Sequence, residues 1–349
     1  MYDQDLDFMR TAVDRASEAG ISAVIASDQA AILYARRLGM EVHLSTQLNI
    51  SNTEALKFYS QWADVAVLAR ELTLDQVNTI ARNVQEENIT GPSGRPIQLE
   101  LFIHGALCMA ISGKCYMSLH QANASANRGE CLQICRRSYT VTDNETGDQL
   151  EIDNEFIMSP KDLCTIGFLN KILDAGVRVL KVEGRARSPE YVKVVTECYS
   201  EAVQAIVDGS YNEIAIEQWL QRLGRVFNRG FWGGYYLGKP LGEWSHRYGS
   251  VATERKVYCG KVTNFFNRLE VVELKVEATP LKAGDSILII GPTTGVVEHT
   301  ISAMRVDDKS VGMVNKGEVC SFTVPTLVRR GDKVYRLEKL AADSTTYYL

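Results

Sequence analysis

The feature that most constrains the fold of this 349-residue chain is a regular alternation of short apolar runs with amphipathic stretches. Apolar residues recur at helical spacing in residues 5–19, 53–62 and 74–85. Helix-capping patterns precede the last two of these stretches. Alternation of strands with helices predicts a parallel sheet with crossover helices. The predicted strands are 23–27, 41–46, 65–69, 97–105 and 177–184.

Polar residues follow strand after strand, and no glycine-rich dinucleotide loop is present. In a (β/α)8 TIM-like barrel the C-terminal strand ends converge on one mouth, where active sites are built. We therefore expect an α/β fold of this type. Only five strands precede the end of the pattern, and the chain opens directly on a helix. Since an unclosed parallel sheet leaves exposed edges, we expect a shortened barrel that lacks about three N-terminal strands.

Two further helices are expected within residues 189–222, and a glycine-rich and aromatic segment follows at 228–240. From Val251 onward the pattern changes to alternating β-strands separated by turns, which predicts a small β-barrel. The sequence therefore predicts two domains. Residues 1–240 form the incomplete barrel and residues 241–349 form a β-barrel accessory domain.

The C-terminal part is more basic than the rest of the chain. Residues 245–337 contain 14 Lys and Arg against 10 Asp and Glu, a local charge of +4, whereas the remainder has 24 against 33, or −9. This asymmetry favours an anionic partner for the accessory domain, although ordinary surface charge gives the same pattern. The candidate phosphate contacts are Lys256, Lys261, Arg268, Arg329 and Arg330.

Five of the eight cysteines fall in one stretch, at Cys108, Cys115, Cys131, Cys135 and Cys164. The N-terminus does not resemble a signal peptide, and no apolar run approaches the roughly 20 residues needed to span a bilayer. The expected compartment is the cytoplasm, where clustered thiols indicate a metal centre rather than disulfides. The spacing of the cysteines does not distinguish a zinc site from an iron–sulfur cluster, and buried free cysteines are the alternative to both.

Other chemically active residues lie at predicted strand ends or beside the cysteines. An arginine at a barrel mouth suits a carboxylate or phosphate, whereas a histidine or carboxylate there can move protons. Structural ion pairs and solvated surface remain alternatives for each of them. The candidate catalytic residues are His104, Glu183, Arg185, Lys181, Arg70 and Glu71, and the candidate cofactor-binding residues are Gln47, Asn49, Arg128 and Arg136.

The segment ELFIHGALCMAISGKCYMS, followed by NRGEC, SPKDLC and KVEGRARS, closely resembles the collagenase-like peptidases of peptidase family U32. HLSTQLNISN and VLARELTL match this family as well, and the resemblance covers residues 5–240. The C-terminal part resembles the accessory β-barrel of the branch that modifies tRNA. Full members begin with a LELLAPAG-like strand, whereas this chain opens on a helix.

The resemblance implies an enzyme that hydroxylates the wobble uridine of tRNA to 5-hydroxyuridine, with prephenate as a small dicarboxylate co-substrate. It also implies a 4Fe–4S cluster bound by Cys108, Cys115, Cys131 and Cys164, with Cys135 as the alternative ligand. Arg70, Arg185 and Lys181 would then bind the carboxylates of the oxygen donor, and Glu183 or His104 would move protons.

Two other functions compete with the RNA hydroxylase. A U32-type peptidase is the first, but the sequence has neither HExxH nor G-x-S-x-G. A Cys108–His104 pair would leave the other clustered cysteines without a role. The second is a non-catalytic RNA-binding remnant, which the missing strands favour.

Overall fold

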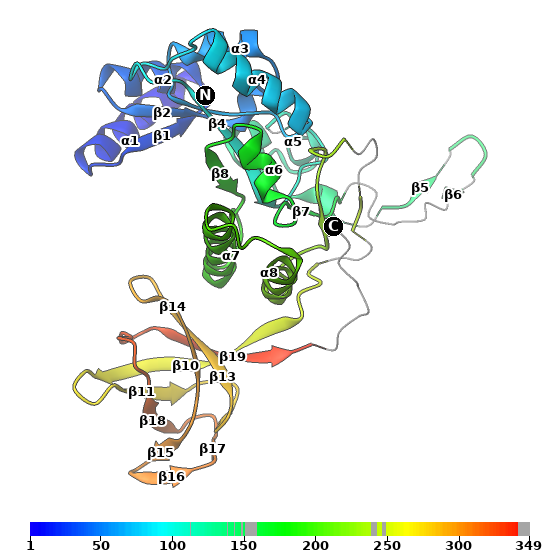
Figure 1. The fold of residues 1–349 in the computed structure, drawn as a ribbon. Coiled ribbons are helices and arrows are strands. Elements are labelled where there is room, and N and C mark those ends of the chain that lie inside the picture. The colour runs from blue at the N-terminus through cyan, green and yellow to red at the C-terminus, as the bar shows by residue number, and fades with distance from the viewer. Residues whose placement is uncertain are drawn as a thin grey trace.

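The computed structural model describes the chain except for Ser112, Ser138, Asp143, Asp148 and residues 151–158, 239–242, 246–248 and 341–349. An α/β part forms about the first two thirds of the chain, and a separate antiparallel part follows it (Figure 1). Each part has its own core of buried apolar side chains. The predicted domain boundary at 240/241 lies outside the described residues. No helix in the described ranges is long and apolar enough to cross a membrane.

All five predicted strands are present, and they pair in parallel. They are β1 (Ala23–Ala26), β2 (Glu41–Leu44), β3 (Val65–Val67), β4 (Gln98–Gly105) and β8 (Val179–Val182), in the order β1-β2-β3-β4-β8. Their polar C-terminal neighbours therefore gather at one edge of the sheet. Helices α1 (Leu6–Glu18), α2 (Gln29–Arg37), α3 (Thr53–Ser60), α4 (Leu74–Glu86) and α6 (Leu169–Asp174) alternate with these strands.

Two strands that the sequence did not predict make the sheet mixed. β7 (Asp162–Cys164) runs antiparallel to the end of β4, with His104 opposite Cys164, and β9 (Phe231–Trp232) runs parallel to β7. Both are only two or three residues long, so their periodicity is too short to detect. In the described residues β1 pairs with β2 alone, and Ile25 on it is 61% exposed. The sheet is thus open there, and a closed eight-stranded barrel stays a prediction.

The cysteine segment, residues 106–137, connects β4 toward β7 through short elements instead of one long helix. It contains α5 (Met117–Ala122) and two 3-10 turns, Ala126–Arg128 and Ile134–Arg136. The hairpin β5 (Val141–Thr142) and β6 (Gln149–Leu150) follows and projects from the body (Figure 1). Such short elements have few hydrogen bonds of their own, so this segment needs contacts with the body to hold its shape.

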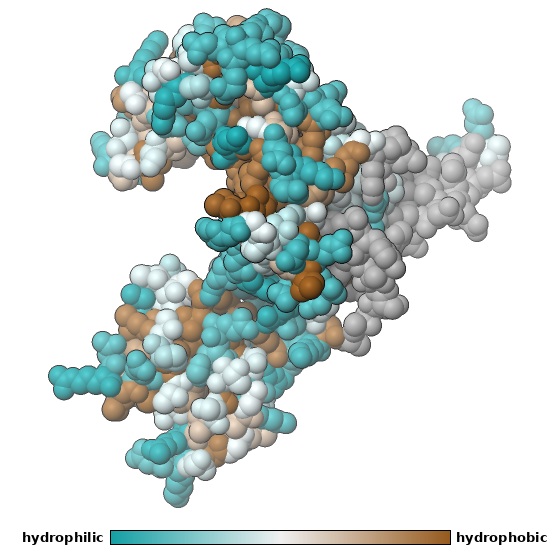
Figure 2. All heavy atoms as spheres, viewed as in Figure 1, coloured by the Kyte–Doolittle hydropathy of each residue, from teal (hydrophilic) through white to brown (hydrophobic). Residues whose placement is uncertain are grey.

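Helices α7 (Pro189–Val207) and α8 (Glu213–Arg225) lead to the C-terminal part, as predicted. Its antiparallel sheet has eight strands in the order β14-β13-β19-β10-β11-β18-β15-β16, and β12 pairs separately with β17. Figure 2 shows apolar side chains gathered near the hollow between the two parts, while the upper helices are largely hydrophilic. The strands are β10 (Glu254–Phe266), β11 (Val271–Val276), β12 (Leu281–Lys282), β13 (Ser286–Gly291), β14 (Gly295–Thr300), β15 (Met304–Val306), β16 (Lys309–Val311), β17 (Met313–Val314), β18 (Val319–Thr323) and β19 (Lys333–Lys339).

Candidate functional site

A cavity of about 210 Å³ lies at the C-terminal ends of β2 and β3, under the first residues of the cysteine segment. It brings together four of the predicted site residues, Asn49, Arg70, Glu71 and Cys108. Parallel pairing of β2, β3 and β4 places these chain segments side by side. The remaining lining residues are Thr46, Leu107, Met109, Ala110, Ile111 and Tyr235.

Arg70 is the cation of this cavity, and its guanidinium is held firmly. Its Nη1 donates to the Ala106 carbonyl at 3.1 Å, and the guanidinium lies 3.7 Å from the centre of the Phe102 ring. Its Nη2 is 3.9 Å from the Glu183 carboxylate, while its buried Nε has no hydrogen-bond partner. A positioned, partly unsatisfied guanidinium can bind a carboxylate without much rearrangement.

Lys181 lies on β8 and Glu183 just beyond it, and both side chains have partners within the protein. Lys181 Nζ is 3.0 Å from Oε1 of Glu100, a buried carboxylate that sequence reasoning missed. Glu183 Oε1 accepts from the Arg185 backbone N–H at 2.8 Å. The sequence does contain a signal for Glu100, which is a charged residue inside the apolar run of β4. A buried carboxylate requires a partner, so this position could have been predicted to pair with a cation.

His104 lies in the core. It is 1% exposed, its Nδ1 is 3.3 Å from the Tyr199 hydroxyl, and its ring packs against Tyr191, Tyr199 and Phe231. Burial, helped by the nearby Arg187, lowers the pKa of His104 to about 3. The imidazole is therefore neutral near pH 7, and its contacts are those of a packed structural residue.

Four of the five clustered cysteines, Cys108, Cys115, Cys131 and Cys135, lie on the cysteine segment. Burial raises the pKa of Cys135, Arg136 opposes this shift, and the charges of Cys131, Cys108 and Cys115 raise the pKa further. These four thiols are exposed or half-buried. Among the described residues no three His, Cys, Asp or Glu side chains are already arranged as a metal site. The segment thus groups four thiols that would have to converge further to bind one centre.

Cys164 is in a different environment. It is fully buried on β7, 3.9 Å from the Tyr199 hydroxyl, and burial raises the pKa of its thiol to about 12. The charges of Cys198 and Asp162 raise this pKa as well. Burial therefore sets Cys164 apart from the four segment thiols, and its place in the ligand set stays a prediction.

The other predicted cofactor-binding residues have internal partners. Gln47 Oε1 accepts from Ser27 Oγ at 2.7 Å. Arg128 contacts both carboxylate oxygens of Asp5 at 3.1 Å and stacks over Tyr2. Arg136 donates three hydrogen bonds within the protein and so does not point freely at a ligand. Arg185 is exposed, with its guanidinium near Gly129 of the cysteine segment.

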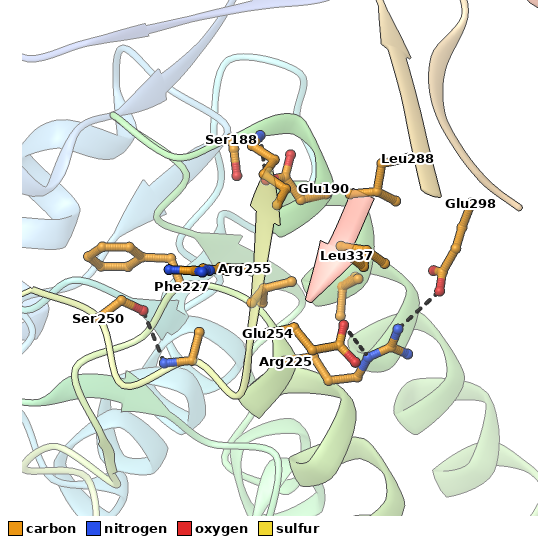
Figure 3. Close-up of a pocket in the computed structure, with 14 residues that line it drawn as sticks. Ser188, Glu190, Arg225, Phe227, Ser250, Glu254, Arg255, Leu288, Glu298 and Leu337 are labelled. Atoms are coloured by element: carbon orange, nitrogen blue, oxygen red, sulfur yellow. Dashed lines mark hydrogen bonds and ion pairs between the residues drawn. The ribbon is translucent and has the colours of Figure 1, made fainter. Parts of the chain in front are cut away.

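A second pocket, of about 290 Å³, lies where α7 and α8 meet the C-terminal part (Figure 3). Its charged residues pair with one another. Arg225 lies 3.1 Å from Glu254 and 3.0 Å from Glu298, and Lys256 lies 2.6 Å from Glu190. Lys256 was a predicted phosphate contact, but here it joins the two parts of the protein. This pocket therefore lies at the interface between the two parts.

The other predicted phosphate contacts lie on the C-terminal part. Lys261 is 3.8 Å from Glu277, and Arg329 donates to Thr294 at 3.3 Å. Arg268 and Arg330 are exposed at turns. All four of these residues are exposed.

Residues 1–246 match peptidase family U32, so the chain belongs to this family. A collagenase of Porphyromonas gingivalis is 57% identical over 339 residues, which cover 97% of this chain and 82% of that protein. The tRNA hydroxylation protein P1 of Bacillus subtilis is 31% identical over 315 residues, covering 88% and 72%. A 23S rRNA 5-hydroxycytidine synthase of Escherichia coli is 37% identical over 209 residues, covering 60% and 30%. The predicted family is thus confirmed.

Proposed function

We propose that this protein is an RNA hydroxylase that converts the wobble uridine of tRNA to 5-hydroxyuridine with a prephenate-like oxygen donor. The observation that carries the proposal is the group of four exposed or half-buried thiols on one segment, of which Cys108 lines a cavity together with Arg70. Relatives named for tRNA hydroxylation and rRNA hydroxycytidine synthesis support the reaction class.

The proposed cofactor is a 4Fe–4S cluster held by Cys108, Cys115, Cys131 and Cys135. Four thiolates are the donor set that such a cluster requires, and these four lie on one segment. When bound, the cluster would supply one-electron transfer. Cys164 is left out of this set because it is buried against Tyr199.

The proposed donor site is the cavity beside Cys108. Arg70 would bind a carboxylate through its guanidinium, and Thr46 and Asn49, which also line the cavity, would offer hydrogen bonds. The cavity is smaller than the roughly 300–1,000 Å³ of drug-sized ligand sites, which suits a small acid better than a peptide chain. Glu71, exposed at the rim, is the carboxylate placed to move a proton, whereas His104 is buried.

We further propose that the parallel strands belong to a TIM-like barrel and that the C-terminal part contacts the tRNA. The polar strand ends at one edge of the sheet support the first point. The exposed Arg268 and Arg330 support the second, because phosphate contacts position a nucleic acid on its protein.

A U32 peptidase is the second candidate, favoured by the 57% identity to a protein named collagenase. A cysteine peptidase would need Cys108 activated by a histidine. His104 has Tyr199 as its Nδ1 partner and is held neutral by burial, so it offers little support for that pair.

The test is anaerobic purification with iron and sulfide analysis, followed by mass spectrometry of tRNA from a deletion strain. We expect cluster-level iron, and loss of 5-hydroxyuridine derivatives that the wild-type gene restores. The Arg70→Gln variant should retain iron but fail to restore the modification. An iron-free protein that cleaves peptides would overturn the proposal in favour of the peptidase.

A further inference from the structure

A buried ion cluster lies beneath the cysteine segment, and the proposed reaction gives it no role. Asp162 on β7 is 1% exposed, and Arg187 Nη2 and Arg229 Nη1 each lie 3.3 Å from one of its carboxylate oxygens. Both guanidinium groups also stack on Phe227, at 4.1 Å and 4.9 Å from the ring centre. A carboxylate this far from water persists only with such partners.

Two arginines connect this region to the turn that carries Cys131 and Cys135. Arg229 Nη2 donates to Gln133 Oε1 at 3.4 Å. Arg136 donates to Ser159 Oγ at 3.2 Å, to the Pro160 carbonyl at 2.7 Å and to the Leu107 carbonyl at 2.6 Å. Leu107 directly precedes Cys108, and Arg136 directly follows Cys135. One guanidinium therefore holds both ends of the cysteine segment against the residues just before β7.

Arg229 also experiences the charges of the other two arginines. Burial lowers the pKa of Arg229, Asp162 opposes the shift, and Arg136 and Arg187 lower it further.

We propose that Arg136, Arg229 and Gln133 are positioning residues that hold the Cys131–Cys135 turn against Leu107, the residue before Cys108, and that the Asp162–Arg187 pair anchors them. The role of these three residues in cluster binding rests on the proposed function. Their effect on the cysteine segment can be measured without metal. Removal of Arg136 frees the Cys131–Cys135 turn from both Leu107 and Pro160.

The first experiment is hydrogen–deuterium exchange with mass spectrometry on the metal-free full chain. We compare wild type with Arg136→Gln and with Arg137→Gln, whose exposed side chain provides a neighbouring control. In Arg136→Gln, peptides covering 131–137 and 106–109 should exchange at least about tenfold faster, equivalent to roughly 1.4 kcal/mol of local stability. Arg137→Gln should match wild type.

The second experiment is anaerobic reconstitution of the same proteins with iron and sulfide. Arg136→Gln should bind less iron and lose the visible absorption of its cluster faster in air, whereas Arg137→Gln should behave as wild type. If Arg136→Gln does not fold by circular dichroism, Gln133→Asn replaces it. Asn tolerates the φ of 53° at this position but is too short to reach Arg229, so residues 131–137 should still exchange faster.

Unchanged exchange in the variants overturns the proposal, and so does faster exchange with wild-type iron content and cluster lifetime. Wild-type protein that takes up no iron would defeat the proposed cofactor instead. In that case the exchange comparison alone decides whether Arg136 and Gln133 hold the segment.

Discussion

The eight cysteines of this chain occupy two kinds of place. Cys108, Cys115, Cys131 and Cys135 lie on the irregular segment after β4 and are exposed or half-buried. The other four are buried on strands or in α7, and burial raises the pKa of each of their thiols. A metal ligand must be a thiolate that the metal can reach. Closeness in sequence groups Cys164 with the four segment cysteines, whereas burial separates it from them. The four buried thiols are Cys164, Cys198, Cys259 and Cys320.

The largest effect should come from exchanging the two disputed ligands. Cys135→Ala should abolish cluster-level iron, because it removes one of four thiolates. Cys164→Ala should retain iron and cost only about 1 kcal/mol, since it removes a small buried side chain. Iron and sulfide per chain after anaerobic purification measure this directly. The reverse pattern, with iron lost only in Cys164→Ala, would identify Cys164 as the ligand in place of Cys135.

The ion cluster beneath the segment should give the next largest effect. Asp162→Asn leaves two buried guanidinium groups without their carboxylate, so the free energy of unfolding should fall by about 3–5 kcal/mol. Urea denaturation measures the change. Asp7→Asn is the control, because the Asp7 side chain is 93% exposed and its loss should change stability by less than about 0.5 kcal/mol. Equal effects would show that Asp162 is not a structural anchor.

The buried thiol of Cys164 should also make stability depend on alkaline pH. Its pKa is raised from the ordinary value of 9.0 to about 12, so below pH 9 the thiol is protonated in both folded and unfolded chains. As pH rises above 9 the unfolded thiol ionises while the folded one does not, and the free energy of unfolding falls. Urea unfolding between about pH 8 and about pH 10.5 should show a shallower decline for Cys164→Ala than for wild type. Identical slopes would mean that this thiol is not buried.

The smallest effect should come from the outer side of the cysteine segment. Arg128 pairs with Asp5 across the surface, with 38% and 25% of the two side chains exposed. Partly exposed ion pairs contribute about 0–1 kcal/mol, so Arg128→Gln should lower stability by less than about 1 kcal/mol and leave iron content unchanged. Urea denaturation with iron analysis checks both. A loss of iron equal to that of Arg136→Gln would place Arg128 in the anchor as well.

Much of the α/β part could be predicted because its patterns are local. Strands β1 to β4, β8 and helices α1, α3, α4, α7 and α8 follow from periodicity and from caps, such as the Thr73–Gln76 capping box. β7 and β9 could not be predicted, since two or three residues carry no period and their pairing partners are distant in the chain. The strand ends predicted one mouth lined by polar residues. Asn49, Arg70 and Glu71 do line one cavity, together with Cys108, whereas Gln47, His104 and Glu183 do not line it.

The family, the five parallel strands and the unusual group of cysteines follow from the amino-acid sequence. Which thiols are buried and which arginines are already paired depends on the three-dimensional fold. The physical reason is that burial and charge pairing depend on contacts between distant segments. Cys164 is fixed by Tyr199, which is 35 residues away, and Arg136 is fixed by Leu107, which is 29 residues away. No local pattern in the sequence carries those contacts.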